Sequence, residues 1–342
     1  MRALAVVTPS FYEKVDDTNR YKIKIDDLEI PLAFVEGNDP DFDADSDQYA
    51  NLVLVKKTSF SLNYRDLGIM ERAWDRLKAV AEDTFYPIGS DFAGHVTAIG
   101  KNVKTLKIDD LVIGNGFFPM SENGAAPGVP SNHASKEFEV YHFAKLLKVP
   151  DYISDTEAGT LCIGIQTANA MVRKAGIQKG ENVLVTSVTS NTSFFLLNAL
   201  WEMDCNVYGL SHSGKNTEII KTHFPFIKDI YTFNTPEFPE KLVFDVVLDA
   251  FSDTYFRLLM QRLNFNARYL TCGIFNQSKN KIENVKPVNL SMFIANIMMR
   301  NISLIGNCLG NTEDLVNGLA IYKTRKMVLD SVFPKPANCR NL

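Results

Sequence analysis

Residues 182–200 read Asn-Val-Leu-Val-Thr, then Ser-Val-Thr-Ser-Asn-Thr-Ser, then Phe-Phe-Leu-Leu-Asn-Ala-Leu. The first segment is typical of a buried strand, the second is a turn of small polar residues, and the third is typical of a buried helix. This order is the usual layout of a dinucleotide pyrophosphate site, because backbone N–H groups and the helix dipole face the anion. Hydroxyl and amide side chains replace the usual glycines, so the stretch predicts a nucleotide site with an unusual turn, and weaker or altered binding is equally compatible with it.

Short strands and helices alternate along the chain around this turn. The expected strands are 182–187, 206–210, 229–233, 244–249, 268–273 and 302–306. The expected helices are 193–203, 215–222, 253–263 and 312–324. Such alternation predicts a parallel sheet covered by helices on both faces. A nucleotide would then bind at the carboxyl ends of the strands, near the turn after Ser187.

The part of the chain before this sheet has a different pattern. Strand-like runs at 52–56, 93–99 and 110–113 are separated by glycines and prolines, which predicts a small β-barrel or sandwich. Residues 154–157, Ser-Asp-Thr-Glu, fit a capping box and predict a helix that ends at Gly176. We therefore expect two domains.

The composition of the chain argues against several classes of protein and site. A chain of 342 residues can bury a sizeable core, and its net charge of −4 provides no basic surface for nucleic acid or an anionic membrane. The five cysteines lie far apart in the sequence, without C-x-x-C pairs. This spacing predicts reduced thiols and a cytoplasmic location rather than disulfides or a structural zinc site.

Several blocks of sequence carry a family resemblance when they are taken in order. They are Ser-Leu-Asn-Tyr-Arg-Asp (61–66), Pro-Ile-Gly-Ser-Asp-Phe-Ala-Gly (87–94), Val-Thr-Ala-Ile-Gly (96–100), Ala-Gly-Thr (158–160), Gly-Glu-Asn-Val-Leu-Val-Thr (180–186), Asp-Val-Val-Leu-Asp (245–249) and Arg-Tyr-Leu-Thr-Cys-Gly (268–273). Over roughly residues 50–334 the chain resembles the medium-chain dehydrogenase/reductase superfamily, and the quinone oxidoreductases and enoyl reductases are the most similar branches.

The resemblance implies an α/β fold with two domains. A GroES-like β-barrel domain would comprise residues 1–150, with 310–342 returning to it. A Rossmann domain with a doubly wound parallel sheet would comprise residues 151–309. The active site would lie between the two domains.

The resemblance also indicates where a catalytic zinc ion would be bound in related enzymes. The catalytic zinc ligands of the alcohol dehydrogenases in this superfamily would fall at Asn63, Ser90 and Ile163. None of these is a thiolate or an imidazole, which are the donors that zinc prefers. We therefore expect no metal site. Zinc-free relatives mostly reduce an activated carbon–carbon double bond in an enone, a quinone or an enoyl thioester.

Candidate catalytic residues follow from the same resemblance. Asn63 and Tyr64 would line the active site, with Tyr64 as a hydrogen-bond or proton donor and Asn63 as an orienter of the substrate or the nicotinamide ribose. Alternatively, Tyr64 is an aromatic residue of the barrel whose hydroxyl bonds to backbone. Thr167 would abut the nicotinamide ring.

Cofactor contacts are expected at the turn and at two strand ends. Ser187, Ser190, Asn191 and Thr192 would face the pyrophosphate, and Gly273 belongs to the cofactor-binding set. After the strand 206–210, NAD-specific enzymes carry an acid, but this chain reads Ser211-His212-Ser213-Gly214-Lys215.

Ser211, Ser213 and Lys215 suit the additional phosphate of NADP(H), which we expect as the cofactor. The alternative is an ordinary polar loop between a strand and a helix.

Two hypotheses about function follow. The first is a zinc-independent, NADPH-dependent oxidoreductase that reduces an activated C=C bond of a small molecule. The alternative is a catalytically silent family member that acts as a binding or scaffolding protein. A homodimer could form through residues 302–306, because related proteins often pair along an edge strand of the nucleotide domain.

Overall fold

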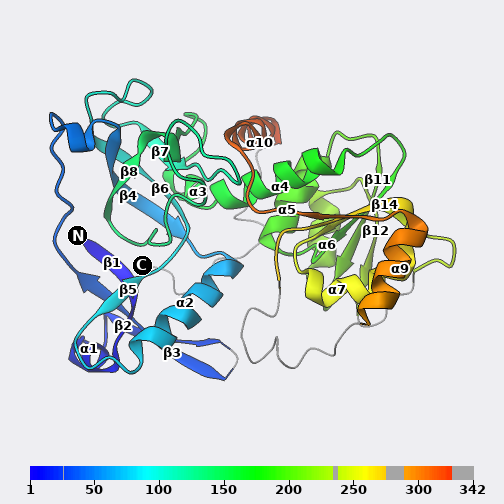
Figure 1. Cartoon of the computed structure of the whole chain (residues 1–342), viewed down its shortest axis with the longest axis horizontal. Helices are drawn as coiled ribbons and strands as arrows, with labels where there is room; N and C mark the ends of the chain where they lie inside the picture. Colours follow the sequence, from blue (N-terminus) through cyan, green and yellow to red (C-terminus); the bar gives the residue numbers. More distant parts are fainter. Residues whose placement is uncertain (26, 234–237, 275–288, 326–342) are drawn as a thin grey trace. The chain divides into compact units, whose positions relative to one another are not determined.

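The computed structural model describes residues 1–25, 27–233, 238–274 and 289–325. The chain divides into two compact units, Met1–Ile163 and Gly164–Leu342, whose elements are labelled in Figure 1. The domain boundaries expected from sequence, 1–150 with 310–342 and 151–309, stay a prediction.

The first unit begins with an antiparallel sheet in the order β2-β3-β1-β5. Its strands are β1 (Arg2–Val7), β2 (Arg20–Ile25), β3 (Leu28–Glu36) and β5 (Phe85–Pro87), and a short helix, α1 (Pro9–Lys14), follows β1. Helix α2 (Tyr64–Leu77) crosses this sheet (Figure 1). Met70 and Ala73 of α2 pack against Val6, Ile30 and Leu32 of the sheet, so burial of one helix face fixes α2 in place.

A second antiparallel sheet of the first unit has the order β8-β4-β6-β7-β9. Its strands are β4 (Leu52–Ser61), β6 (Asp91–Ile99), β7 (Leu111–Gly114), β8 (Phe138–His142) and β9 (Leu146–Lys148). The 3-10 helices η1 (Asp47–Tyr49) and η2 (Phe143–Lys145) and the short helix α3 (Asp155–Ala158) complete the unit. Alternate residues such as Val53, Val55, Phe92 and Val96 form its core, as expected for strands buried on one face.

The second unit contains a six-stranded parallel sheet in the order β12-β11-β10-β13-β14-β15. Its strands are β10 (Asn182–Thr186), β11 (Asn206–Ser211), β12 (Ile227–Thr232), β13 (Phe244–Asp249), β14 (Leu263–Thr271) and β15 (Ser303–Gly306). Along the chain, β11 and β12 are added on one side of β10, and β13, β14 and β15 then follow on its other side. The carboxyl ends of β10 and β13 therefore mark the switch point at which ligands bind in such sheets.

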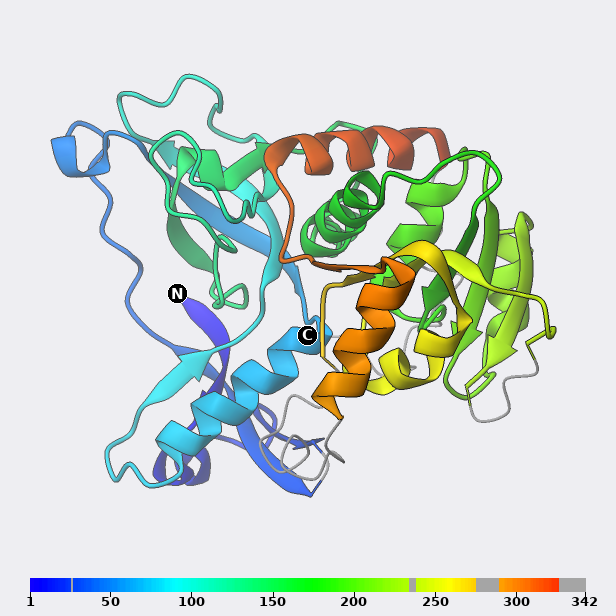
Figure 2. The ribbon, with the colours of Figure 1, turned by 45° about the vertical axis from the view of Figure 1, so that its right-hand side comes forward.

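Helices accompany this sheet. They are α4 (Cys162–Ala175), α5 (Asn191–Leu200), α6 (Thr217–His223), α7 (Ser252–Leu259) with η3 (Met260–Arg262), α9 (Leu290–Arg300) and α10 (Thr312–Arg325). Figure 2 shows α10 beside α4, and two features hold the pair together. Asp314 accepts two hydrogen bonds of 2.8 Å from the Arg173 guanidinium, and a Cβ at Gly318 would lie 2.1 Å from Ile165.

The predicted fold class, an α/β protein with an antiparallel barrel-like part and a doubly wound parallel sheet, is confirmed. The single helix expected from residue 155 to Gly176 is instead two helices, α3 and α4, with a turn at 159–161. At this turn the chain packs closely on β4, since a Cβ at Gly159 would lie 2.3 Å from Ser59 Oγ. The α10 helix belongs to the second unit, and residues 326–342 lie outside the described residues.

Helix α2, the hairpin of β2 and β3, and helix α9 were not among the predicted elements. None of the helices in the described part of the chain combines the length and hydrophobicity that a membrane-spanning segment requires.

Candidate functional site

The first candidate site lies in the first unit, where β4 leads into α2. Asn63 immediately precedes α2, and its backbone N–H donates to Asp66 Oδ2 at 2.7 Å, so Asp66 caps the helix from within its first turn. The Asn63 side chain also donates from Nδ2 to Asp91 Oδ2 at 3.1 Å. Tyr64 is the first residue of α2 and is 36% exposed. The structure thus places the two predicted catalytic residues side by side at a helix N-terminus.

Two carboxyl groups beside Asn63 are part of a buried polar group, here called the acidic cluster. The acidic cluster consists of Asn63, Asp66, Ser90, Asp91 and Cys162. Asp66 is 0% exposed and Asp91 is 1% exposed. The Ser90 hydroxyl donates to Asp66 and accepts from the Arg65 guanidinium, while Asp91 Oδ1 accepts from the Ile163 backbone N–H at 3.0 Å. Sequence reasoning missed this cluster, although an Asp inside the apolar strand run Asp91–Ile99 was a usable signal.

Burial raises the pKa values of the titratable groups in the acidic cluster. Desolvation raises the pKa of Asp91 to about 6, despite hydrogen bonds from Asn63 and Ile163 that favour the ionised form. Desolvation also raises the pKa of Asp66, and it raises the pKa of the Cys162 thiol well above its ordinary value. The cluster therefore holds a carboxyl group that exchanges a proton near neutral pH, a property typical of functional sites.

The three positions that would ligate zinc in the related alcohol dehydrogenases take part in this hydrogen-bond network. Asn63 and Ile163 both donate to Asp91, and Ser90 bridges Asp66 and Arg65. None of the three side chains is a thiolate or an imidazole, the donors that zinc prefers. Among the described residues, no three His, Cys, Asp or Glu side chains lie close enough together to hold a metal ion.

The second candidate site lies in the second unit, at the turn between β10 and α5. Ser187, the first residue of this turn, has φ of 45°. This left-handed conformation is the one that glycine adopts readily and other residues adopt rarely. The turn therefore keeps a backbone shape that favours glycine although its sequence has none.

The hydroxyl groups of the turn are used to hold that shape. Ser187 Oγ donates to Tyr255 Oη at 2.9 Å, and Ser190 caps α5 by accepting from the Ser193 N–H at 3.3 Å. Ser193 Oγ donates back to the Thr186 carbonyl at 2.7 Å. Ser187 and Ser190, two of the predicted phosphate contacts, thus have protein partners in this structure.

Asn191 and Thr192 differ from those serines. They are the first two residues of α5, where backbone N–H groups have no partner within the helix. Asn191 is exposed, and within the described residues neither side chain makes a hydrogen bond. Both are available to an anion at the helix N-terminus.

Steric packing also supports the turn. Val188, the second residue of the turn, is fully buried next to Gly209 of β11. A Cβ at Gly209 would lie 3.0 Å from both Val188 Cγ2 and Ile230 Cγ1. The turn therefore rests on a strand position that has no side chain.

A buried hydrogen-bond network joins the carboxyl ends of three strands beside this turn. Asp249, at the end of β13, accepts from Thr186 Oγ1 of β10 at 2.5 Å and from the Tyr269 hydroxyl of β14. It also accepts from the Phe251 N–H at 2.9 Å. Burial raises the pKa of Asp249. The network holds the carboxyl ends of these three strands together at the switch point. The sequence analysis did not predict it.

The loop after β11 contains the residues predicted to select NADP(H). Ser211 is buried and its Oγ accepts from the Gly214 N–H at 3.1 Å, whereas Ser213 and Lys215 are exposed. Within the described residues Lys215 forms no salt bridge. The His212 ring stacks on Phe233, with ring centroids 5.4 Å apart. The loop thus presents a free ammonium group and no carboxylate at the end of β11.

The remaining predicted cofactor residues lie in the second unit. Thr167 is on α4 and is 7% exposed. Gly273 follows β14, where a Cβ would lie 2.5 Å from the Ala250 carbonyl oxygen, so only glycine permits this approach of two strand ends. The structure places Ser187 and Ser190 in the turn and Asn191 and Thr192 in the first turn of α5. A direct contact of any of these residues with a cofactor stays a prediction.

Comparison with known proteins agrees with this architecture. Residues 49–151 match the family model described as the alcohol dehydrogenase GroES-like domain. An acryloyl-coenzyme A reductase of Sulfurisphaera tokodaii is 22% identical over 293 residues, which cover 80% of this chain and 82% of that enzyme. The low-reducing polyketide synthase drtA of Aspergillus calidoustus is 24% identical over 241 residues, which are 69% of this chain but only 9% of the synthase.

Solved structures resemble the chain in fold. A thermostable alcohol dehydrogenase from Pyrobaculum aerophilum superposes with a TM-score of 0.68 at 20% identity, covering 98% of both chains. Residues 49–151 thus match a GroES-like domain of the alcohol dehydrogenase type, and the chain has the fold of the medium-chain dehydrogenase/reductases, as its sequence predicted.

Proposed function

We propose that this protein is a zinc-independent, NADPH-dependent oxidoreductase that reduces an activated C=C bond in an enone, a quinone or an enoyl thioester. The main support is the turn after β10, which keeps left-handed backbone at Ser187 and leads directly into the N-terminus of α5. Left-handed backbone in a non-glycine residue costs about 1 kcal/mol or more, and its position directly before a helix N-terminus at the switch point supports a pyrophosphate site.

NADPH would be held mainly by the second unit. The N-terminus of α5, with Asn191 and Thr192, would contact the pyrophosphate. Lys215, with Ser213, would contact the additional phosphate on the adenosine ribose, where NAD-specific proteins have an acid. Bound NADPH would supply the hydride.

The first unit supports reduction of a C=C bond rather than of a simple carbonyl. Its zinc-ligand positions hold Asn63, Ser90 and Ile163, so no Lewis acid is available there to polarise a carbonyl oxygen. Reduction of a conjugated C=C bond can proceed without a Lewis acid, because hydrogen-bond donors stabilise the charge that develops on the enolate oxygen. The similarity to an acryloyl-coenzyme A reductase favours an enoyl thioester among the three substrate classes.

Tyr64 and Asn63 would act on that enolate. Tyr64 is partly exposed and lies next to Asn63, whose side chain is oriented by Asp91. After hydride adds to the β-carbon, the Tyr64 hydroxyl would donate a proton to the α-carbon and recover one from solvent. We expect Tyr64→Phe to lower kcat by about 100-fold with little change in NADPH affinity. If Tyr64 only packs, the variant will instead lose stability with kcat unchanged.

Titration with NADPH and NADH, followed by nicotinamide fluorescence, tests the proposal directly. We expect saturable binding with a preference for NADPH. Asn191→Leu should weaken binding by about tenfold or more, because it removes hydrogen bonds to a charged ligand. Asn317→Leu, on the exposed face of α10, is the matched control and should bind normally. No binding of either nucleotide at high micromolar concentration would favour the alternative, a catalytically silent binding protein.

A homodimer and a cytoplasmic location complete the proposal. Edge strand β15 exposes Leu304, and neighbouring α9 exposes Met292, Met298 and Met299, which are 65–74% exposed. Such apolar surface is typical of an interface. Cys162, Cys205, Cys272 and Cys308 are free thiols, which suits a reducing compartment. Sedimentation of the protein, compared with a Leu304→Lys/Met298→Lys variant, tests the dimer.

A further inference from the structure

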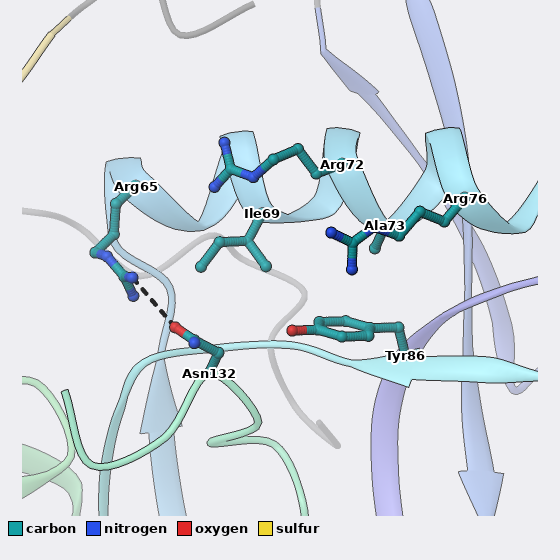
Figure 3. Close-up of a pocket in the computed structure, with 7 residues that line it drawn as sticks. All are labelled: Arg65, Ile69, Arg72, Ala73, Arg76, Tyr86 and Asn132. Atoms are coloured by element: carbon teal, nitrogen blue, oxygen red, sulfur yellow. Dashed lines mark hydrogen bonds between the residues drawn. The ribbon is translucent and has the colours of Figure 1, made fainter. Parts of the chain in front are cut away.

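The first unit contains a cavity of about 170 Å³ along one face of α2. Figure 3 shows Arg65, Arg72 and Arg76 projecting from this helix, with Tyr86 and Asn132 opposite them. We call this cavity the arginine pocket. No carboxylate is among the described side chains that line it.

Helix geometry explains why three arginines share the pocket. Residues 69, 72, 73 and 76 each follow another residue of this set by three or four positions, so all five lie on a single face of an α-helix. Ile69 and Ala73 form the apolar floor between the arginine side chains. The opposite wall comes from β5, which contains Tyr86, and from the segment that contains Asn132.

The three arginines have different partners. The Arg65 guanidinium donates to Asn132 Oδ1 at 3.1 Å and to Ser90, and lies 3.7 Å from Asp66. Arg72 and Arg76 are exposed, and within the described residues neither forms a salt bridge or a hydrogen bond. Two positive charges therefore face one cavity, and no anionic side chain in the described part of the chain pairs with them.

We propose that the arginine pocket binds a phosphate group of a small-molecule ligand. Guanidinium groups bind phosphate through paired N–H donors, and neighbouring hydroxyl and amide groups such as Tyr86 and Asn132 add neutral hydrogen bonds. The apolar floor and the volume leave room for part of an organic group beside the phosphate. Phosphate is the shared chemistry of two sources: a phosphorylated thioester carrier such as coenzyme A, and free inorganic phosphate. The site does not depend on the proposed reductase activity.

Binding is measured by calorimetry on the full-length protein without nicotinamide cofactor, with inorganic phosphate and adenosine 3′,5′-bisphosphate as probes. We expect saturable binding, and an at least tenfold loss of affinity in Arg72→Gln/Arg76→Gln. Lys78→Gln/Arg257→Gln removes two exposed positive charges outside the pocket and should change affinity less than twofold. Circular dichroism checks that both variants fold, which their exposed positions lead us to expect.

The two sources give different results in the same experiment. Tighter binding of the bisphosphate, together with competition by coenzyme A, assigns the pocket to a phosphorylated carrier. Equal binding of both probes assigns it to free phosphate. The proposal is overturned if neither probe saturates at millimolar concentration, or if the two double variants lose affinity equally. Normal NADPH binding with no phosphate binding would reject this site alone, and the converse result would reject only the reductase.

Discussion

Raising the pH from 4.5 to 7.5 should destabilise the first unit, because Asp91 must then ionise in a buried position. Its pKa is about 6 in the folded protein against an ordinary value of 3.8. A raised pKa means that the folded state binds the proton more tightly than the unfolded state. The stabilisation is therefore complete below pH 3.8 and is lost as the pH rises through about 6.

The size of the effect follows from the pKa difference. A change from 3.8 to about 6 corresponds to about 3 kcal/mol in the free energy of unfolding, and about 2 kcal/mol of this is lost between pH 4.5 and 7.5. Asp91 is 1% exposed, so solvent screening does not reduce this value much.

Urea unfolding at the two pH values measures the effect. The chain has 2 tryptophans, Trp74 on α2 in the first unit and Trp201 after α5 in the second. Trp201→Phe leaves Trp74 as the reporter of the first unit. Asp91→Asn keeps the size of the side chain and removes its charge, so it should reduce the pH dependence by about 2 kcal/mol. An equal loss of stability between the two pH values with and without the Asp91→Asn substitution would refute the assignment.

Two further perturbations have definite expected outcomes. Burial opposes ionisation of Glu139, but hydrogen bonds and charges from His133 and Lys57 outweigh it and hold its pKa below 4.5. The free energy of unfolding should therefore decrease as the pH falls below 4.5. In a pH titration of stability, Glu139→Gln should make this decrease smaller. Gly164→Ala would put a Cβ 2.3 Å from two ring carbons of Phe195, so it should destabilise the second unit by about 1–3 kcal/mol in spite of its better helix propensity. Trp201 fluorescence reports this, and Phe195→Leu in the same chain should restore part of the loss.

Much of the fold could be predicted from the sequence because apolar periodicity determines it. Strand β13 has the predicted bounds, and β10 and α5 differ by one to three residues at their ends. Helix α2 was missed because its start, Asn63-x-x-Asp66, falls in a stretch interpreted as strand-like, and Gly68 interrupts its pattern. Helix α9 was missed because apolar residues occupy most of its faces, so it shows little helical periodicity.

The candidate site could be located from sequence but not resolved in detail. The segment containing Ser187 and Ser190 was identified correctly as a turn before a helix. Which hydroxyls remain available to a ligand was not predictable, because each competes for nearby backbone and side-chain partners that only the folded chain brings into reach. Asp91 and Asp249 were overlooked as site residues for a related reason, since their importance comes from burial and not from a motif.

The contact between Val188 and Gly209 has a consequence for how this chain can evolve. A Cβ at position 209 would lie 3.0 Å from Val188 Cγ2 and from Ile230 Cγ1, so a side chain there requires both neighbours to shift. A smaller residue at position 188 would relieve only one of these two contacts. We therefore expect a side chain at position 209 only in descendants in which both neighbours have already become smaller.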